Sequence, residues 1–162
     1  MIELNIGKHG NIFELPQNGE AVCVTTNGIV KSDGTAVMGA GIAREANHYF
    51  NLAPKLGKYI TQYGNRAFNL GLYQRCPTDC PKAEVIFTIF SFPTKHDWRN
   101  DSDITLICRS AEQLMEMCDK FGVTKCYLTP PGCGCGKLNW KNTVKPWLSQ
   151  ILDDKFVVVF RK

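Results

Sequence analysis

Lys95 is the residue of this sequence best suited to chemistry on a bound ligand. It follows the apolar run 85–92, directly after Pro93 and Thr94, and it precedes His96. A lysine that is held beside a buried strand and partly desolvated can bind phosphate, lower its own pKa or attack an anomeric carbon. The alternative is a solvated loop lysine, which is the commonest environment of lysines in proteins.

Two glycine-rich segments are suited to bind an anion through backbone N–H groups. Residues 39–41 run into a helix-like stretch, so free N–H groups and the positive helix end could meet a phosphate there. The glycines within 132–136 would allow close approach of the backbone and an anion nest. Neither segment has the spacing of a dinucleotide-binding motif or a P-loop. Tight turns and helix caps are the alternative interpretation of these glycines.

Other polar side chains near these segments extend the candidate site. Asn27 ends the apolar run 21–24, where its amide could bond a sugar hydroxyl, although a turn residue beside Gly28 is an alternative. Trp98 and Arg99 could form a stacking and phosphate-binding surface for an oligonucleotide, and a partly buried Trp98 is the alternative.

The elements that must position these residues alternate along the chain. Apolar runs rich in β-formers predict strands at 2–6, 21–24, 69–74, 85–92, 126–129 and 156–160. Three- and four-residue apolar spacing from Ile104 to Phe121 predicts a helix, with Ser102 as its N-cap and Gly122 at its end. Further helices are expected at 41–50, 54–63 and 140–152, the last with Asn139 as N-cap and a kink or restart at Pro146.

Alternation of strands and helices predicts an α/β fold with three layers, in which helices cover both faces of a central mixed, largely parallel sheet. We expect one domain over 1–162, because no internal repeat or linker interrupts the chain. Ligands bind outside the carboxyl ends of strands in such sheets. The segments after 21–24, 85–92 and 126–129 should therefore meet at one edge and form a site.

Composition restricts the class of protein. A net charge of +4 is compatible with an anionic ligand but too small for a surface that coats nucleic acid. Eight cysteines without a C-x-x-C pair, Cys76 and Cys80 being four apart, argue against a zinc site, and most thiols are expected to be buried. No signal peptide or membrane-spanning run is visible, so we expect a cytoplasmic monomer without metal, cofactor or membrane contact.

The order of these motifs along the chain resembles the macrodomain family. Residues 10–13, 26–28, 37–43 and 131–140 resemble the family's opening motif and its two ligand loops. Residues 92–99 read Phe-Pro-Thr-Lys-His-Asp-Trp-Arg and resemble the F-P-T-K-x-x-W-R segment of the DarG antitoxin macrodomains. Those enzymes remove ADP-ribose from thymidine in DNA, and the related human terminal ADP-ribose glycohydrolase acts on protein acyl esters.

The resemblance implies a role for each matching residue. Lys95 would be the catalytic residue near the anomeric carbon, and Asn27 would bind and orient the distal ribose. Asn11 and Ile12 would meet the adenine, with Asn11 standing where many members have Asp. The pyrophosphate and distal ribose would be held between two sets of residues: Met38, Gly39, Ala40, Gly41, Ile42 and Ala43, and Pro131, Gly132, Cys133, Gly134, Cys135, Gly136 and Lys137.

Two departures from the family pattern affect the expected mechanism. The insertion-like stretch 31–36 lengthens the first ligand loop and could reshape access for the substrate. Gly136 stands where the human enzyme carries a catalytic Asp, which argues against a mechanism that resolves a lysine adduct with that carboxylate. DarG-like members also have glycine there.

Four functions are compatible with this sequence. The leading hypothesis is an ADP-ribosyl glycohydrolase that removes ADP-ribose from a macromolecule, either DNA thymidine or acyl-linked protein. A non-catalytic reader of ADP-ribose needs only the same two loops. Phosphatase action on ADP-ribose 1″-phosphate is a further activity of the family. A nucleic-acid-binding module would use Lys95, Trp98 and Arg99, and such a contact with single-stranded DNA is more plausible as an addition to the substrate site.

Overall fold

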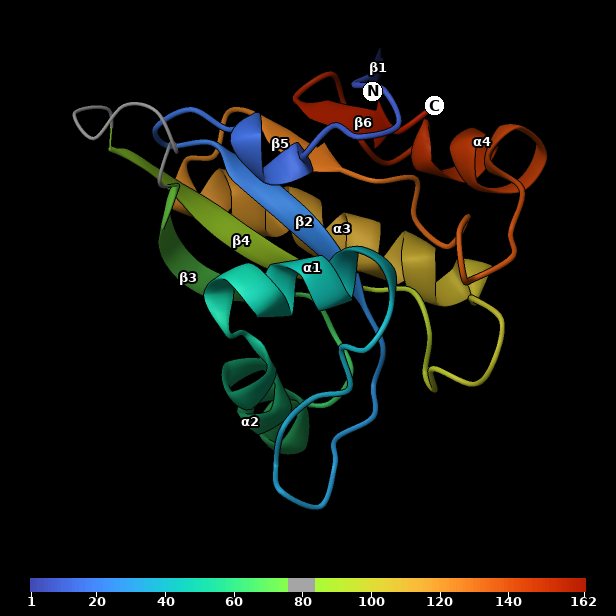
Figure 1. Ribbon diagram of the computed structural model, residues 1–162. Helices are drawn as coiled ribbons and strands as arrows, with labels where there is room; N and C mark the ends of the chain where they lie inside the picture. Colours follow the sequence, from blue (N-terminus) through green and yellow to red (C-terminus); the bar gives the residue numbers. More distant parts are fainter. Residues whose placement is uncertain (76–83) are drawn as a thin grey trace.

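The computed structural model describes residues 1–75 and 84–162, so Cys76 and Cys80 lie outside the described residues (Figure 1). The strands are β1 (Ile2–Asn5), β2 (Ala21–Thr26), β3 (Phe68–Arg75), β4 (Val85–Pro93), β5 (Cys126–Leu128) and β6 (Phe156–Phe160). The helices are α1 (Gly41–Phe50), α2 (Ala53–Tyr63), α3 (Ile104–Phe121) and α4 (Lys145–Leu148), with a 3-10 turn η1 (Ile12–Glu14) and a π turn η2 (Trp140–Val144). No helix among these described residues is both long and apolar enough to cross a membrane.

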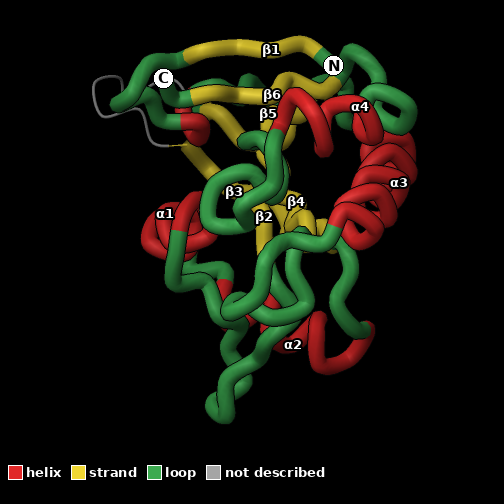
Figure 2. Tube along the Cα trace, turned by 90° about the vertical axis from the view of Figure 1, so that its right-hand side faces the viewer, coloured by secondary structure: helices red, strands yellow, loops and turns green. Residues whose placement is uncertain are grey.

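The strands form one six-stranded sheet in the order β1-β6-β5-β2-β4-β3. All neighbouring pairs are parallel except β3 with β4. Figure 2 shows α1 on one side of this sheet and α3 and α4 on the other, which confirms the predicted three-layer α/β/α fold. The strand predicted at 69–74 is β3, which pairs antiparallel along the edge through a register shift between Asn69 and Leu72.

Two apolar cores, one on each face of the sheet, hold the helices in place. Val22 and Val24 of β2 face the α1 and α2 side, and Cys23 faces α3. In β4 the same alternation sends Phe87 toward α1 and α2 and Phe90 toward α3. A strand covered on both faces must be apolar at nearly every position, which is why the runs 21–24 and 85–92 are nearly all apolar.

The long helix α3 has the predicted length but a different N-cap. Asp103, not Ser102, is the N-cap: its carboxylate accepts a hydrogen bond from the Thr105 N–H. The negative charge of a carboxylate at this position also interacts favourably with the positive end of the helix dipole, whereas a hydroxyl is neutral. The backbone N–H of Ser102 donates instead to the Gly136 carbonyl at 3.0 Å. Gly122 ends the helix with φ of 66°, as predicted.

The helix expected at 140–152 is interrupted near Pro146, as predicted, but only residues 145–148 of it are α-helical. The chain forms the π turn Trp140–Val144, and α4 then starts at Lys145 with Pro146 in its first turn. Proline has no N–H and its ring clashes with the preceding turn, so a new helix begins around it. Asn139 is the N-cap of the first turn, as predicted, and accepts a hydrogen bond from the Asn142 N–H at 2.8 Å.

The insertion-like stretch 31–36 packs against α2. The Ala36 N–H donates to the Ala53 carbonyl at 2.9 Å, and Val30 and Ala36 form a bridge that closes the stretch. Gly57 lies beneath it: a Cβ at this position would overlap the Gly34 carbonyl oxygen and lie 2.8 Å from the Ala36 nitrogen. Glycine is therefore required inside this helix because the backbone of another segment occupies the space of a side chain.

Replacing Gly57 with alanine tests this contact. Alanine normally stabilises a helix interior by about 1 kcal/mol relative to glycine. Here we expect Gly57→Ala to lower the free energy of unfolding by about 1–2 kcal/mol, because the new methyl group must displace the 31–36 backbone. Urea denaturation measures the change. The exposed Lys58→Ala is the matched control, and a stabilised Gly57→Ala variant would contradict the packing described here.

Candidate functional site

A cavity of about 1040 Å³ lies at the carboxyl edge of the sheet, large enough for a dinucleotide-sized ligand. Its walls come from the ends of four mutually parallel strands, β2, β4, β5 and β6, and from the loops that follow them. The convergence expected for the segments after β2, β4 and β5 is therefore present. The residues that line the cavity and carry the argument below are Thr26, Asn27, Val37, Met38, Gly39, Ala40, Gly41, Ile42, Ala43, Glu45, Lys95, Trp98, Ser102, Gly132, Cys133, Gly134, Cys135, Gly136, Trp140, Lys141, Phe160, Arg161 and Lys162.

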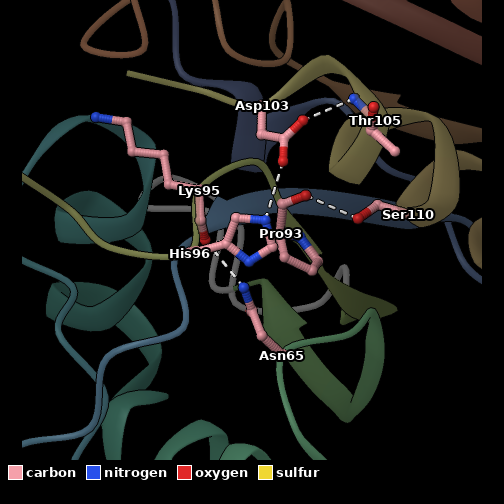
Figure 3. A network of polar contacts seen from close by, with 7 residues as sticks. All are labelled: Asn65, Pro93, Lys95, His96, Asp103, Thr105 and Ser110. Atoms are coloured by element: carbon pink, nitrogen blue, oxygen red, sulfur yellow. Dashed lines mark hydrogen bonds and ion pairs between the residues drawn. The ribbon is translucent and has the colours of Figure 1, made fainter. Parts of the chain in front are cut away.

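The backbone around Lys95 is fixed by hydrogen bonds to two other segments, residues 26–28 and Asn65. The Thr94 N–H donates to the Thr26 carbonyl at 3.0 Å, and the Gly28 N–H donates to the His96 carbonyl at 3.2 Å. The Lys95 carbonyl itself accepts from Asn65 Nδ2 at 3.0 Å (Figure 3). These bonds continue the β2–β4 pairing past the end of the sheet and hold Lys95 at the edge.

The start of α3 holds the same segment from the other side. Ser110 Oγ donates to the Pro93 carbonyl at 2.7 Å, and His96 Nε2 lies 3.0 Å from Asp103 Oδ2 (Figure 3). The hydrogen bond from His96 is the main reason why the pKa of Asp103 is lowered. Figure 3 shows the Lys95 side chain extending away from this network. The network thus fixes the backbone and leaves the amine for the cavity.

The Lys95 amine joins the two loops that face each other across the cavity. Nζ donates to the Cys135 carbonyl at 3.2 Å and to the Trp98 carbonyl at 3.4 Å. A lysine ammonium has three protons, so one proton is left for a ligand. The geometry therefore places a cation at the junction of the β4 loop and the glycine-rich loop after β5.

Trp98 forms an exposed aromatic face at the mouth of the cavity, with 53% of its surface accessible. Arg99 lies over its ring at 5.8 Å and pairs with Asp97 through two hydrogen bonds of 2.9 and 2.5 Å. Hydrogen bonds from the Arg99 side chain and backbone lower the pKa of Asp97 to about 2. Of the two alternatives, an exposed or a partly buried Trp98, the structure shows the exposed one, with Arg99 held beside it by Asp97.

Two segments offer backbone N–H groups to an anion. Helix α1 begins at Gly41, and its N-cap Ala40 makes no side-chain hydrogen bond to the first turn. The N–H groups at this helix end lie at the cavity wall, where they can bind a phosphate. Within the described residues, the N–H groups of Gly134, Cys135 and Gly136 donate to no protein acceptor. The two segments thus face the cavity with donors available.

Asn27 uses its amide to close the first loop. Its Nδ2 donates to the Val37 carbonyl at 2.9 Å, and its Oδ1 accepts from the Ile29 N–H at 3.0 Å. An amide NH₂ has a second proton, and Asn27 lines the cavity. Asn27 can therefore close the loop with one amide proton and contact a ligand with the other.

Gly136 is packed so closely that it cannot carry a side chain. A Cβ there would overlap Ser102 Oγ and lie 2.5 Å from the Gly132 carbonyl oxygen. Ser102 Oγ is buried and has no hydrogen-bond partner among the described residues. Position 136 is therefore closed to any carboxylate in this chain. Cys133 is also unsuited to nucleophilic chemistry, because burial raises the pKa of its thiol to about 11.

The cavity is electropositive. Lys95, Lys141, Arg161 and Lys162 line it, and the carboxylate among the lining residues is that of Glu45. Glu45 accepts two hydrogen bonds from Arg161, at 2.7 and 2.9 Å, so its charge is already compensated. The lysines are left to attract an anionic ligand.

Four of the predicted ligand residues do not line this cavity. Asn11 accepts a hydrogen bond from the Phe13 N–H at 3.0 Å and caps η1, while Ile12 is fully buried in the core behind it. Pro131 is also buried, and Lys137 points outward, 3.8 Å from Asp101. The remaining predicted residues, 38–43 and 132–136 together with Asn27 and Lys95, surround the cavity.

The β6 end of the cavity was missed in the sequence. Phe160, Arg161 and Lys162 line it because β6 is parallel to β5 and ends at the same edge. The rule that ligands bind at the carboxyl ends of parallel strands, which we applied to the other three strands, would also have predicted residues 160–162. Their signal is a parallel strand that is followed by polar residues. Glu45 and Ser102 had no comparable signal, because neither follows a strand.

No protein-family model and no curated protein sequence matches the chain. Solved structures match with probability 1.00. The macrodomain of Thermus aquaticus DarG is 27% identical over 99% of both chains, with a TM-score of 0.66. The macrodomain of Mycobacterium tuberculosis DarG is 23% identical over 99% of both chains, with a TM-score of 0.67. The chain has the macrodomain fold.

A further structure relates this macrodomain to a longer protein. Thermosipho africanus DarTG, solved in complex with ADP-ribose, is 22% identical with a TM-score of 0.67. The match covers 93% of the present chain but 39% of that protein. The macrodomain is therefore similar to one part of the larger DarTG chain.

The Asp97–Arg99 pair gives this macrodomain a pH-dependent loop. The pKa of Asp97 is lowered to about 2 in the folded protein, so the pair stabilises the fold above the unfolded pKa of about 3.9 and is lost as pH falls through 2. We expect Asp97→Asn to lower Tm at pH 7 and the difference from wild type to vanish near pH 2. Asp101→Asn is the matched control. A difference that stays constant between pH 7 and pH 2 would contradict this account.

Proposed function

We propose that this macrodomain binds ADP-ribose in the cavity and hydrolyses the bond between ADP-ribose and a macromolecule. The similar DarTG protein that was solved with ADP-ribose supports the ligand. The size of the cavity, its positive charge and the N–H donors on two of its walls support a diphosphate-bearing nucleotide.

The observation that carries the proposal is the position of the Lys95 amine. It bridges the Trp98 and Cys135 carbonyl groups, so it stands between the loop after β4 and the glycine-rich loop after β5. A ribose whose diphosphate is held by residues 39–43 and 132–136 would bring its anomeric carbon close to this amine. Its backbone is fixed from three sides, which reduces the cost of aligning it with a reacting atom.

In the proposed reaction, the bond between the anomeric carbon and the carrier atom breaks. The electron pair leaves with the carrier, which takes up a proton, and the oxygen of water bonds to the anomeric carbon. As a neutral amine, Lys95 would attack the anomeric carbon while the bond to the carrier breaks; water would then displace it and give up a proton, and Asn27 would orient the ribose. Because Gly136 cannot carry a carboxylate, no second acid at that position takes part.

The carrier is proposed to contact the rim of the cavity. Trp98 is half exposed there and Arg99 lies beside it, so a base next to the modified nucleotide could stack on the indole of Trp98. This favours single-stranded DNA as carrier over an acyl-linked protein.

A second candidate is a non-catalytic reader of ADP-ribose. The Lys95 amine donates to two carbonyl groups, and a lysine held in this way can bind a ligand without reacting with it. The same cavity serves both functions, and turnover is what separates them.

Removal of the Lys95 amine tests catalysis. We expect Lys95→Ala to reduce turnover by about 10²–10⁴-fold while ADP-ribose affinity changes by less than about tenfold, because the diphosphate contacts come from other residues. Release of ADP-ribose is measured on three substrates: ADP-ribosylated thymidine in single-stranded DNA, an acyl-linked peptide and ADP-ribose 1″-phosphate. Lys120→Ala, an exposed lysine of α3, is the matched control.

Each outcome assigns the function differently. Tight ADP-ribose binding in calorimetry without turnover on any linkage would identify a reader. Release of inorganic phosphate from the 1″-phosphate alone would identify a phosphatase. Full turnover by Lys95→Ala would overturn the role of Lys95, and absence of ADP-ribose binding would overturn the proposal as a whole.

A further inference from the structure

A second, smaller cavity of about 530 Å³ continues from the β6 end of the first. Trp140, Lys141, Phe160 and Lys162 line both cavities. The further residues of the second cavity are Glu3, Leu4 and Asn5 of β1 and Lys145 of α4. We call this second cavity the β1 groove. It is therefore an extension of the candidate site.

The β1 groove is basic and partly aromatic. Three lysines, Lys141, Lys145 and Lys162, line it against the one carboxylate of Glu3. Lys162 lies over the Phe160 ring at 4.8 Å, and Trp140 packs edge-on against the same ring with centroids 5.9 Å apart. The groove thus combines apolar walls with an excess of positive charge, which suits an anionic group attached to a nucleoside.

Glu3 forms an ion pair with one of these lysines, Lys145. Lys145 Nζ lies 2.9 Å from Glu3 Oε1, which also accepts from Trp140 Nε1 at 2.8 Å. The Trp140 hydrogen bond first and the Lys145 contact second lower the pKa of Glu3, so it is ionised at neutral pH. Both side chains of the ion pair are about half exposed, at 46% and 42%. Exposed pairs of this kind are weak, so a phosphate dianion can compete with Glu3 for Lys145.

The sheet order determines which end of a nucleotide reaches the β1 groove. Lys95 follows β4 and Phe160 ends β6, with β2 and β5 between them. Strands about 4.8 Å apart separate these ends by roughly 14 Å. This span is suited to an ADP-ribose with its distal ribose at Lys95 and its adenosine at β6. The aromatic walls of Trp140 and Phe160 at the β6 end suit the adenosine.

We propose that the β1 groove binds a phosphate group carried by the adenosine ribose, so that this macrodomain prefers ADP-ribose extended at its adenosine end. This inference rests on the proposed function, because it requires ADP-ribose in the first cavity. The phosphate can be a 2′-phosphate or the diphosphate of a further ADP-ribose unit. Unextended ADP-ribose has its phosphates between the two riboses, so it would leave Lys145 paired with Glu3 and would bring no phosphate to the β1 groove.

Calorimetric titration of the full chain with two ligands tests the proposal. At low salt, we expect ADP-ribose 2′-phosphate to bind about five- to tenfold more tightly than ADP-ribose, the sum of a few exposed charge pairs. The preference should shrink toward one at 0.5 M NaCl, because exposed charges are screened at about that ionic strength. A dimer of ADP-ribose is the third ligand, and a gain for the dimer alone identifies a further unit as the source of the phosphate.

Two variants with opposite expected effects keep the test independent of folding defects. Lys145→Ala should reduce the preference for the phosphorylated ligand, and Glu3→Gln should increase it while its amide oxygen still accepts from Trp140. Neither residue lines the first cavity, so the affinity for ADP-ribose itself is the internal reference. Lys58→Ala on α2 is the matched control.

The inference and the proposed function fail in different ways. Tight binding of ADP-ribose with no gain for either extended ligand overturns the β1 groove alone. A gain that is unchanged in both Lys145→Ala and Glu3→Gln also overturns it, since the phosphate then binds elsewhere. Absence of binding by all three ligands overturns the proposed function, and the β1 groove with it.

Discussion

The parallel pairing of β2 with β4 and β5, and of β5 with β6, is the constraint on which the rest of this structure depends. Parallel strands end at the same edge, so segments that are more than 30 residues apart in sequence deliver their loops to one place. Backbone hydrogen bonds between Thr26 and Thr94 and between Gly28 and His96 extend the pairing beyond the strands. The cavity exists because these loops meet above the ends of a sheet that is apolar on both faces.

Rigid backbone and free side chain are combined at Lys95. Its neighbours are tied to β2, to Asn65 and to α3, each through a hydrogen bond whose donor or acceptor comes from a different element. The amine, by contrast, touches two loop carbonyl groups and projects away from the network. Such an arrangement fixes where a cation stands without committing it to one partner, which is useful both for binding and for chemistry.

The site differs in character from one end to the other. Around Lys95 the walls are glycine backbone. Gly136 lies so close to Ser102 that position 136 cannot carry a side chain that would act together with the lysine. Toward β6 the walls are Trp140 and Phe160 with lysines around them. Backbone donors suit a diphosphate, which needs many short contacts, whereas aromatic walls suit a nucleoside. In the proposed function, this difference would give a bound nucleotide a direction along the edge of the sheet.

By itself, the sequence determined the layers of the fold, because strands buried on both faces must be apolar throughout and α3 must carry one apolar stripe. It also determined that the loops after β2, β4 and β5 meet, since this follows from parallel strands. Tertiary structure alone decided that Asp103 caps α3, that residues 140–144 form a π turn, and that residues 160–162 and Glu45 join the site. These features depend on which atoms lie close in space, such as the Gly136 carbonyl that takes the Ser102 N–H. Spacing along the chain carries no record of such contacts between distant segments.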